Sequence, residues 1–152
     1  PDAADPAKAR MAELKDGKKG PALGPFFRQM QDVMMSGVGV YRNAGDMKGA
    51  MARLSDLRQR YTEVRAQNSG DNFNSEVLGI LELGNLLDLA YVTAAASLER
   101  QESRGAHSRQ DFTDRDDERW LQHSLAFLDD DEVAMGSKKV DISRFEPKPR
   151  VY

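Results

Sequence analysis

Hydrophobic residues recur at alternating steps of three and four along three segments between residues 23 and 98. This spacing is typical of amphipathic helices, because a period near 3.6 keeps such residues on one face. The segments contain Leu23, Phe26, Met30, Val33, Gly37 and Val40; Met47, Ala50, Leu54, Leu57, Tyr61 and Val64; and Val77, Ile80, Gly84, Leu87, Tyr91, Ala94 and Leu98. The pattern therefore predicts three helices.

The ends of these helices carry their own signals. Asp46 and Asn74 stand at the start of the second and third segments, where a side-chain oxygen can accept a hydrogen bond from a free backbone amide. We expect both to be N-caps. Gly105 follows the third segment, and glycine readily adopts the left-handed conformation that ends many helices. We expect it to terminate the third helix.

These features predict a mainly α fold. We expect residues 23–105 to form an antiparallel three-helix bundle, similar to a spectrin repeat, with left-handed crossings like those of coiled coils. Residues 1–22 are rich in Pro, Gly, Ala and Lys, and we expect a linker or a poorly packed lead-in there.

The pattern changes in residues 106–152, which we expect to form an extended C-terminal segment with short β-structure. Residues 120–127 alternate between two faces, as in a strand. The run "DDDE" predicts a turn, and residues 132–143 predict a hairpin around Gly136 and Ser137. The proline-containing tail "RFEPKPRVY" is expected to lie extended and to dock on another surface.

Composition excludes several classes of function. The net charge of −3 argues against nucleic-acid binding, and the absence of cysteine excludes disulfides and thiol chemistry. The apolar stretch from Leu86 to Leu98 is shorter than the roughly 18 residues that a spanning helix requires, so we expect no direct membrane insertion. The first residue is not Met, which suggests a piece of a longer chain.

Candidate chemistry is sparse. The two histidines, His107 and His123, have no helical metal-ligand spacing between them, and neighbouring serines show only proximity in sequence. The sequence has no glycine-rich phosphate loop, and its methionines at helical spacing are typical of a core. We therefore predict no catalytic, cofactor-binding or metal-binding residue in this chain.

An arginine- and aspartate-rich segment over residues 102–123 has two interpretations. In the first, its cations favour a helix C-terminus and "TDRDDE" is a solvated turn. In the second, Arg104, His107, Arg109 and Arg115 pair with carboxylates across an interface, which suits the planar fork of arginine. The residue types alone leave both open.

The string "ESRGAHSRQDFTDRDDERWLQHSL" resembles the C-terminal signature of the flavoprotein subunit of succinate dehydrogenase and fumarate reductase. That signature reads E-S-R-G-A-H-x-R-x-D-[FY], then R-D-D-x-x-W-x-x-H, with P-x-x-R-x-Y near the end. "GVYRNAGDMKGAMARLSDLRQRY" is also similar to the family, and the resemblance covers residues 21–152. One departure is Thr113, where the family often has Pro.

This resemblance implies a helical C-terminal domain that supports a separate FAD-binding domain. FAD and the substrate-binding residues would lie in the preceding domains, outside this chain, and the full enzyme would oxidise succinate to fumarate and pass electrons to an iron–sulfur subunit. The subunit would be cytoplasmic and held peripherally at the inner face of the membrane by its partners. The residues expected at the interdomain contact are Arg104, His107, Arg109, Asp111, Arg115, Asp116, Trp120, His123, Arg150 and Tyr152.

Two alternatives remain. The helical periodicity also allows a free-standing interaction module with no relation to flavin. L-aspartate oxidase shares a shorter version of the signature, although "RDDERW" and the P-x-x-R-x-Y ending favour the dehydrogenase.

Overall fold

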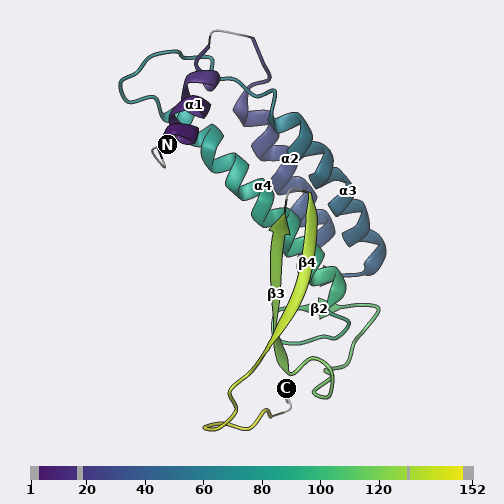
Figure 1. The fold of residues 1–152 in the computed structure, drawn as a ribbon. Helices are drawn as coiled ribbons and strands as arrows, with labels where there is room; N and C mark the ends of the chain where they lie inside the picture. Colours follow the sequence, from purple (N-terminus) through teal and green to yellow (C-terminus); the bar gives the residue numbers. More distant parts are fainter. Residues whose placement is uncertain (1–3, 17–18, 130, 149–152) are drawn as a thin grey trace.

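A computed structural model describes residues 4–16, 19–129 and 131–148. Helices dominate, and the strands are short, as the sequence predicts (Figure 1). The elements are α1 (Asp5–Leu14), α2 (Leu23–Val38), β1 (Tyr41–Arg42), α3 (Ala44–Tyr61), α4 (Ser75–Glu99), β2 (Ser108–Arg109), β3 (Gln122–Asp129) and β4 (Glu132–Lys139).

Helices α2, α3 and α4 lie side by side and share one hydrophobic core (Figure 1). Each helix contributes from the face that its periodic segment defines. The buried residues include Phe26, Met30 and Val33 of α2, Leu54 and Leu57 of α3, and Ile80, Leu83 and Leu87 of α4. Burying each large side chain contributes about 1.5–3 kcal/mol, which is the main favourable contribution to folding here.

The caps match the sequence at one helix and differ at the other. Asn74 caps α4, because its side-chain oxygen accepts from the amide of Val77 at 3.2 Å. The prediction that Asp46 caps α3 is wrong. Asn43 is the cap and accepts from the amide of Asp46 at 2.9 Å, while its own side-chain nitrogen donates to the Asp46 carboxylate at 2.7 Å. The two residues exchange hydrogen bonds, much as in a capping box, and Asp46 lies in the first turn of the helix.

Gly105 does not terminate α4. The helix ends at Glu99, and Arg100 is already extended. Gly105, with φ of +59°, lies in a tight turn closed by two backbone hydrogen bonds between Arg104 and His107, at 2.8 and 2.9 Å. Positive φ at the first central position is typical of type II′ turns, so the glycine is needed for this turn rather than for a helix end.

The C-terminal hairpin turns at a different place from the one expected. Strand β3 pairs antiparallel with β4, and Asp129 faces Glu132 at the closed end, so the acidic run marks the turn. Gly136 and Ser137, expected at the turn, instead lie within β4 opposite Leu125 and Ser124. A Cβ at Gly136 would lie 3.5 Å from the Phe127 ring, an ordinary van der Waals contact, so this strand position does not require glycine.

Part of the expected lead-in is a packed helix. Residue Leu14 at the end of α1 is fully buried in the shared core, and its carbonyl accepts from the amide of Ala66 at 3.1 Å. Glu13 accepts from Arg65 at 2.9 Å. The segment has little hydrophobic periodicity of its own, and its contacts with residues 61–66 hold it in place.

Helix α4 is long and apolar enough to cross a membrane by length and composition alone. The apolar stretch Leu86–Leu98 is only part of this helix, which begins at Ser75. In the fold, α4 packs against α2 and α3 through Val77, Ile80, Leu83, Leu87, Ala90 and Ala94. Core helices pass the same composition test, and this packing is that of a core helix.

Two helical glycines provide a test of the α2–α3 packing. A Cβ at Gly37 would lie 2.5 Å from the Ala50 Cβ and 3.0 Å from the Asp46 carbonyl oxygen, whereas a Cβ at Gly49 would meet nothing within 4 Å. We expect Gly37→Ala to lower the free energy of unfolding by about 1–3 kcal/mol through overpacking. Gly49→Ala should raise it by about 0.4–1 kcal/mol. Urea denaturation measures both, and equal effects would contradict the close packing at Gly37.

Candidate functional site

Arg109 lies at the centre of a charged network at the C-terminal end of α4. Its side chain is 1% exposed. Nη1 donates to the carbonyls of Ser97, Leu98 and Arg100 at 3.0–3.1 Å. These carbonyls stand at the end of α4, where a helix leaves acceptors without internal partners and favours positive charge. Arg109 therefore caps α4 from a distant loop.

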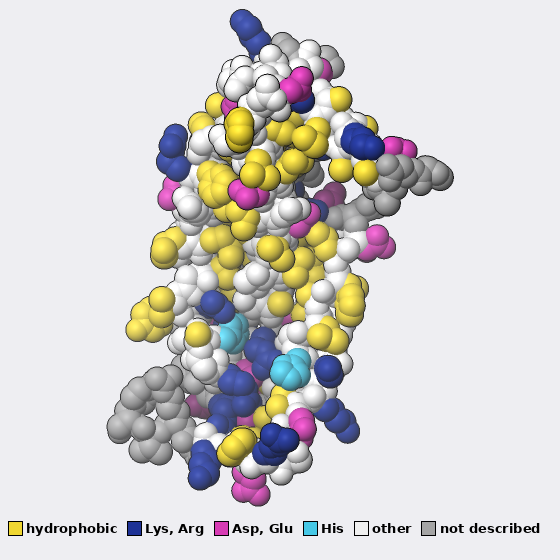
Figure 2. All heavy atoms as spheres, turned by 90° about the vertical axis from the view of Figure 1, so that its left-hand side faces the viewer, with side chains coloured by type: hydrophobic (Ala, Val, Ile, Leu, Met, Phe, Trp, Pro, Cys, Tyr) yellow, Lys and Arg dark blue, Asp and Glu magenta, His cyan; other side chains and the backbone are white. Residues whose placement is uncertain are grey.

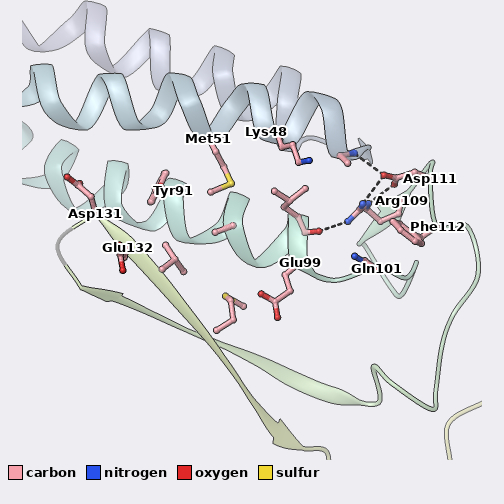
Figure 3. Close-up of a pocket in the computed structure, with 15 residues that line it drawn as sticks. Lys48, Met51, Tyr91, Glu99, Gln101, Arg109, Asp111, Phe112, Asp131 and Glu132 are labelled. Carbon is pink, nitrogen blue, oxygen red and sulfur yellow. Dashed lines mark hydrogen bonds and ion pairs between the residues drawn. The ribbon is translucent and has the colours of Figure 1, made fainter.

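The rest of the Arg109 guanidinium binds Asp111. Nε and Nη2 donate to the two carboxylate oxygens at 2.7 and 2.8 Å, in the bidentate geometry that suits arginine (Figure 3). The amide of Ala44, the first residue of α3, also donates to Asp111 at 2.9 Å. The hydrogen bond from Arg109, helped by this amide, holds the pKa of Asp111 well below its usual range and outweighs desolvation, which acts to raise it. The pair links the end of α4 to the start of α3.

Glu102 forms a second buried centre and is fully buried. It accepts from Arg100, from Arg104 at 2.8 and 3.0 Å, and from the amide of Asp116 at 2.9 Å. Burial acts to raise the pKa of Glu102, but the hydrogen bonds outweigh burial and lower it. A buried carboxylate stays charged only when it has such partners.

Arg100 joins this centre to the hairpin. Its guanidinium lies over the Trp120 ring at 5.2 Å and donates to the Trp120 carbonyl at 3.0 Å. It also donates to the carbonyl of Gln122 and to the Ser124 hydroxyl, both on β3. One side chain therefore fixes the base of the hairpin to the end of α4.

His107 has a defined tautomer. Its Nδ1 lies 2.8 Å from Nη1 of Arg42, and its Nε2 lies 3.1 Å from the carbonyl of Arg100. Arginine can only donate, so Nδ1 accepts and Nε2 carries the proton. Burial, with the nearby cations Arg42, Arg109 and Arg100, lowers the pKa of His107. The neutral ring thus joins the loop after α2 to the loop after α4.

The remaining predicted site residues lie closer to the surface. Arg115 donates a hydrogen bond to the Asp117 carboxylate at 2.7 Å, and Arg104 donates to the same carboxylate at 2.7 Å. The Asp116 carboxylate accepts a hydrogen bond from Nε of Arg119 at 2.6 Å. His123 is exposed on β3. The structure brings together Arg104, His107, Arg109, Asp111, Arg115, Asp116 and Trp120, whereas Arg150 and Tyr152 lie outside the described residues.

Sequence reasoning missed four members of the network as site residues: Arg42, Arg100, Glu102 and Ser103. Glu102 and Ser103 belong to the signature string, and Arg42 to the second similar string, so a signal existed for these three, whereas Arg100 lies outside both strings. Ser103 accepts from the amide of Arg109 and donates to the Phe112 carbonyl, both at 2.8 Å. Position in a motif did not reveal that Glu102 is the buried acceptor of two arginines.

A groove of about 830 Å³ lies between β4, α3 and α4 beside this network (Figure 3). Its apolar lining includes Met51, Tyr91 and Phe112. Arg109 and Asp111 pair with each other at one end, and the remaining charges are Lys48 against Glu99, Asp131 and Glu132. This excess of carboxylates disfavours a pyrophosphate, so the groove does not fit FAD. In the described ranges, no three His, Asp or Glu side chains come together to hold a metal ion.

Two arginines with aspartate partners test the buried fork. Arg109→Lys replaces the fork by one ammonium, which cannot bind Asp111 in a bidentate manner and reach three carbonyls. We expect a loss of about 2–4 kcal/mol in the free energy of unfolding. Arg119→Lys, whose side chain is 71% exposed, should change it by less than about 0.5 kcal/mol. Equal losses in thermal denaturation would show that the buried fork is unimportant.

His107 should make stability depend on pH. Its pKa is lowered from 6.5 in the fold, so the unfolded chain binds more protons between that value and the lower folded one. The contribution is fully present above pH 6.5 and is lost as pH falls through the folded pKa. Denaturant titration from pH 7.5 to 5 should show this loss.

The matched variants identify the residue responsible. His107→Gln should remove this part of the pH dependence, whereas His123→Gln, at an exposed position, should retain it. An unchanged pH profile in His107→Gln would mean that another group causes the loss.

Comparison with known proteins gives the network a family context. The family described as "Fumarate reductase flavoprotein C-term" matches residues 27–152. The fumarate reductase flavoprotein subunit of Haemophilus influenzae is 39% identical over 145 residues, which are 95% of this chain and 24% of that protein. The succinate dehydrogenase flavoprotein subunit of Coxiella burnetii is 37% identical over 131 residues, covering 85% of this chain and 22% of that protein.

The fold agrees with these matches. A solved chain of E. coli quinol fumarate reductase superposes with a TM-score of 0.87 at 33% identity, covering 100% of this chain and 27% of that one. The chain spans about a quarter of the length of the relatives it matches. It contains the signature segment, with Glu102, Arg104 and Arg109 in a buried network. The chain therefore belongs to the fumarate reductase flavoprotein C-terminal family.

Proposed function

We propose that this chain is the C-terminal structural domain of the flavoprotein subunit of a succinate dehydrogenase or fumarate reductase. The family match over residues 27–152 carries the proposal. The contacts of the signature arginines favour a structural role over a catalytic one, since these arginines bind carboxylates and carbonyls of the chain itself.

In this proposal the full-length subunit holds FAD in domains outside this chain. The subunit transfers a hydride between the dicarboxylate and FAD; it passes electrons to an iron–sulfur subunit when succinate is oxidised and receives them from it when fumarate is reduced. The present chain contributes no group to that chemistry and packs against the FAD-binding domain. The flavoprotein subunit would sit peripherally at the cytoplasmic face of the membrane, held there by its partner subunits.

The network gives this role a physical basis. It fixes the loops of residues 100–124 against the ends of α3 and α4, so that they can present a preorganised surface. A rigid surface loses less entropy on docking than a mobile loop. The proposed arrangement of α2–α4, an antiparallel three-helix bundle with left-handed crossings, would provide the base for these loops.

The alternatives have less support. The curated relatives described above are fumarate reductase and succinate dehydrogenase subunits, which favours these enzymes over L-aspartate oxidase. Those relatives are about four times longer than the matched region, which favours a domain over a free-standing module.

Arg104→Ala in the full-length subunit tests the supporting role. The change removes two of the hydrogen bonds to the buried Glu102 and the ion pair to Asp117. We expect a local cost of about 2–3 kcal/mol and a lower flavin-to-protein ratio after purification. Arg53→Ala, an exposed arginine on α3, is the matched control and should retain flavin. Unchanged flavin content and activity in Arg104→Ala would contradict the role assigned to this network.

A further inference from the structure

Two adjoining pockets open at the C-terminal end of α4, beside β3, with volumes of about 470 and 410 Å³. Both are lined by Arg100, His107 and Ser124, and the larger one also by Arg104, Trp120 and His123. Among the described residues no aspartate or glutamate lines either pocket. The lining therefore favours an anionic group.

The buried network holds the arginines that line these walls. Glu102 pairs with Arg100 and Arg104 from the buried side and Asp117 pairs with Arg104, yet neither carboxylate lines the opening, so the opening presents arginine hydrogen-bond donors. Arg104 uses Nε and Nη2, and within the described chain its Nη1 has no acceptor. Both histidines lie with lysines and arginines in the lower half of the face in Figure 2.

Trp120 supplies a second, independent observation. Its indole Nε1 is buried and has no hydrogen-bond acceptor among the described residues. Buried polar groups in proteins are nearly always hydrogen-bonded, and an indole N–H can only donate. Trp120 lines the larger pocket, so an oxygen of a docked segment that reaches this N–H would supply the missing acceptor.

An apolar surface adjoins the pockets. Leu78, Leu86 and Leu89 of α4 are 58%, 37% and 62% exposed, and their spacing of eight and three places them on one side of the helix. Farther along the same helix, Val92 and Ala96 line the smaller pocket. Hydrophobic side chains also gather in the upper half of the face in Figure 2. Neighbouring exposed apolar residues of this kind mark interaction surfaces.

We propose that this face docks an acidic segment of the preceding part of the same longer polypeptide. A carboxylate of that segment enters the pocket at Arg104, Trp120 and His123, and its hydrophobic side chains cover the strip of Leu78, Leu86 and Leu89. A free small anion would fill the pocket and leave the strip exposed, which is why a peptide fits the whole face better. The inference rests on the proposed function and adds the chemistry of the docked segment.

A photo-crosslinking side chain at Gln122, which lines the larger pocket, tests the occupant directly in the full-length subunit. Mass spectrometry should find the crosslink on an Asp- or Glu-containing peptide that precedes this domain in the same chain. A crosslink to a different subunit, or no crosslink, would overturn the proposal. Loss of the crosslink on adding succinate or phosphate would show a free-anion site and would also overturn it.

Gln122→Glu tests the charge requirement with an almost unchanged shape. In the full-length subunit it should speed hydrogen exchange of the amides around residues 120–124 by roughly tenfold, because the new carboxylate repels the docked one. Gln101→Glu adds the same charge at an exposed position on the other groove and should have little effect. Neither change should alter exchange in the present chain alone.

These outcomes separate the two proposals. If Gln122→Glu behaves like Gln101→Glu, the carboxylate pocket is wrong, yet an Arg104→Ala subunit that loses flavin would still support the structural role. If Arg104→Ala retains flavin and the crosslink forms as expected, the docking surface stands and only its importance for flavin is refuted.

Discussion

The structure depends on placing one arginine where water does not reach. Arg109 is charged, buried and satisfied on every side by Asp111 and by the last carbonyls of α4. An isolated buried guanidinium would be very unfavourable, so these partners have to be fixed before Arg109 can be accommodated. Asp111 also accepts a hydrogen bond from the first amide of α3. The partners of Arg109 therefore set the positions of the end of α4, the start of α3 and the loop that carries Arg109 and Asp111.

The second centre, Glu102, extends the same constraint to the hairpin. Arg100 binds Glu102, stacks on Trp120 and reaches Ser124, so one buried carboxylate positions the loop and the base of β3. The charged residues therefore fall into two groups, those buried in the network and those that line the surface pocket. The carboxylates of the network pair with its arginines, and among the described residues Arg100 and Arg104, but no carboxylate, line the pocket beside β3.

Much of the helical part could be predicted, because its periodic residues are the ones that become buried, as Ile80 and Leu87 do. Tertiary contacts decided the rest. Asn43 and Asp46 offer equal capping chemistry, and only their reciprocal hydrogen bonds show which is the cap. The sequence pattern places the end of α4 at Gly105, whereas the helix ends at Glu99, where Arg109 binds the free carbonyls. The signature string identified the site region, whereas the burial of Glu102 followed only from the fold.

The most direct test of this account is to co-express the chain with the preceding part of the proposed full-length subunit, produced as a separate polypeptide. Bound flavin and succinate-dependent dye reduction would be measured with both pieces and with the preceding part alone. The account predicts that the pieces associate and that flavin retention and activity require both. A preceding part that holds flavin and reduces the dye equally well by itself would contradict it, and would assign the domain to assembly with other subunits.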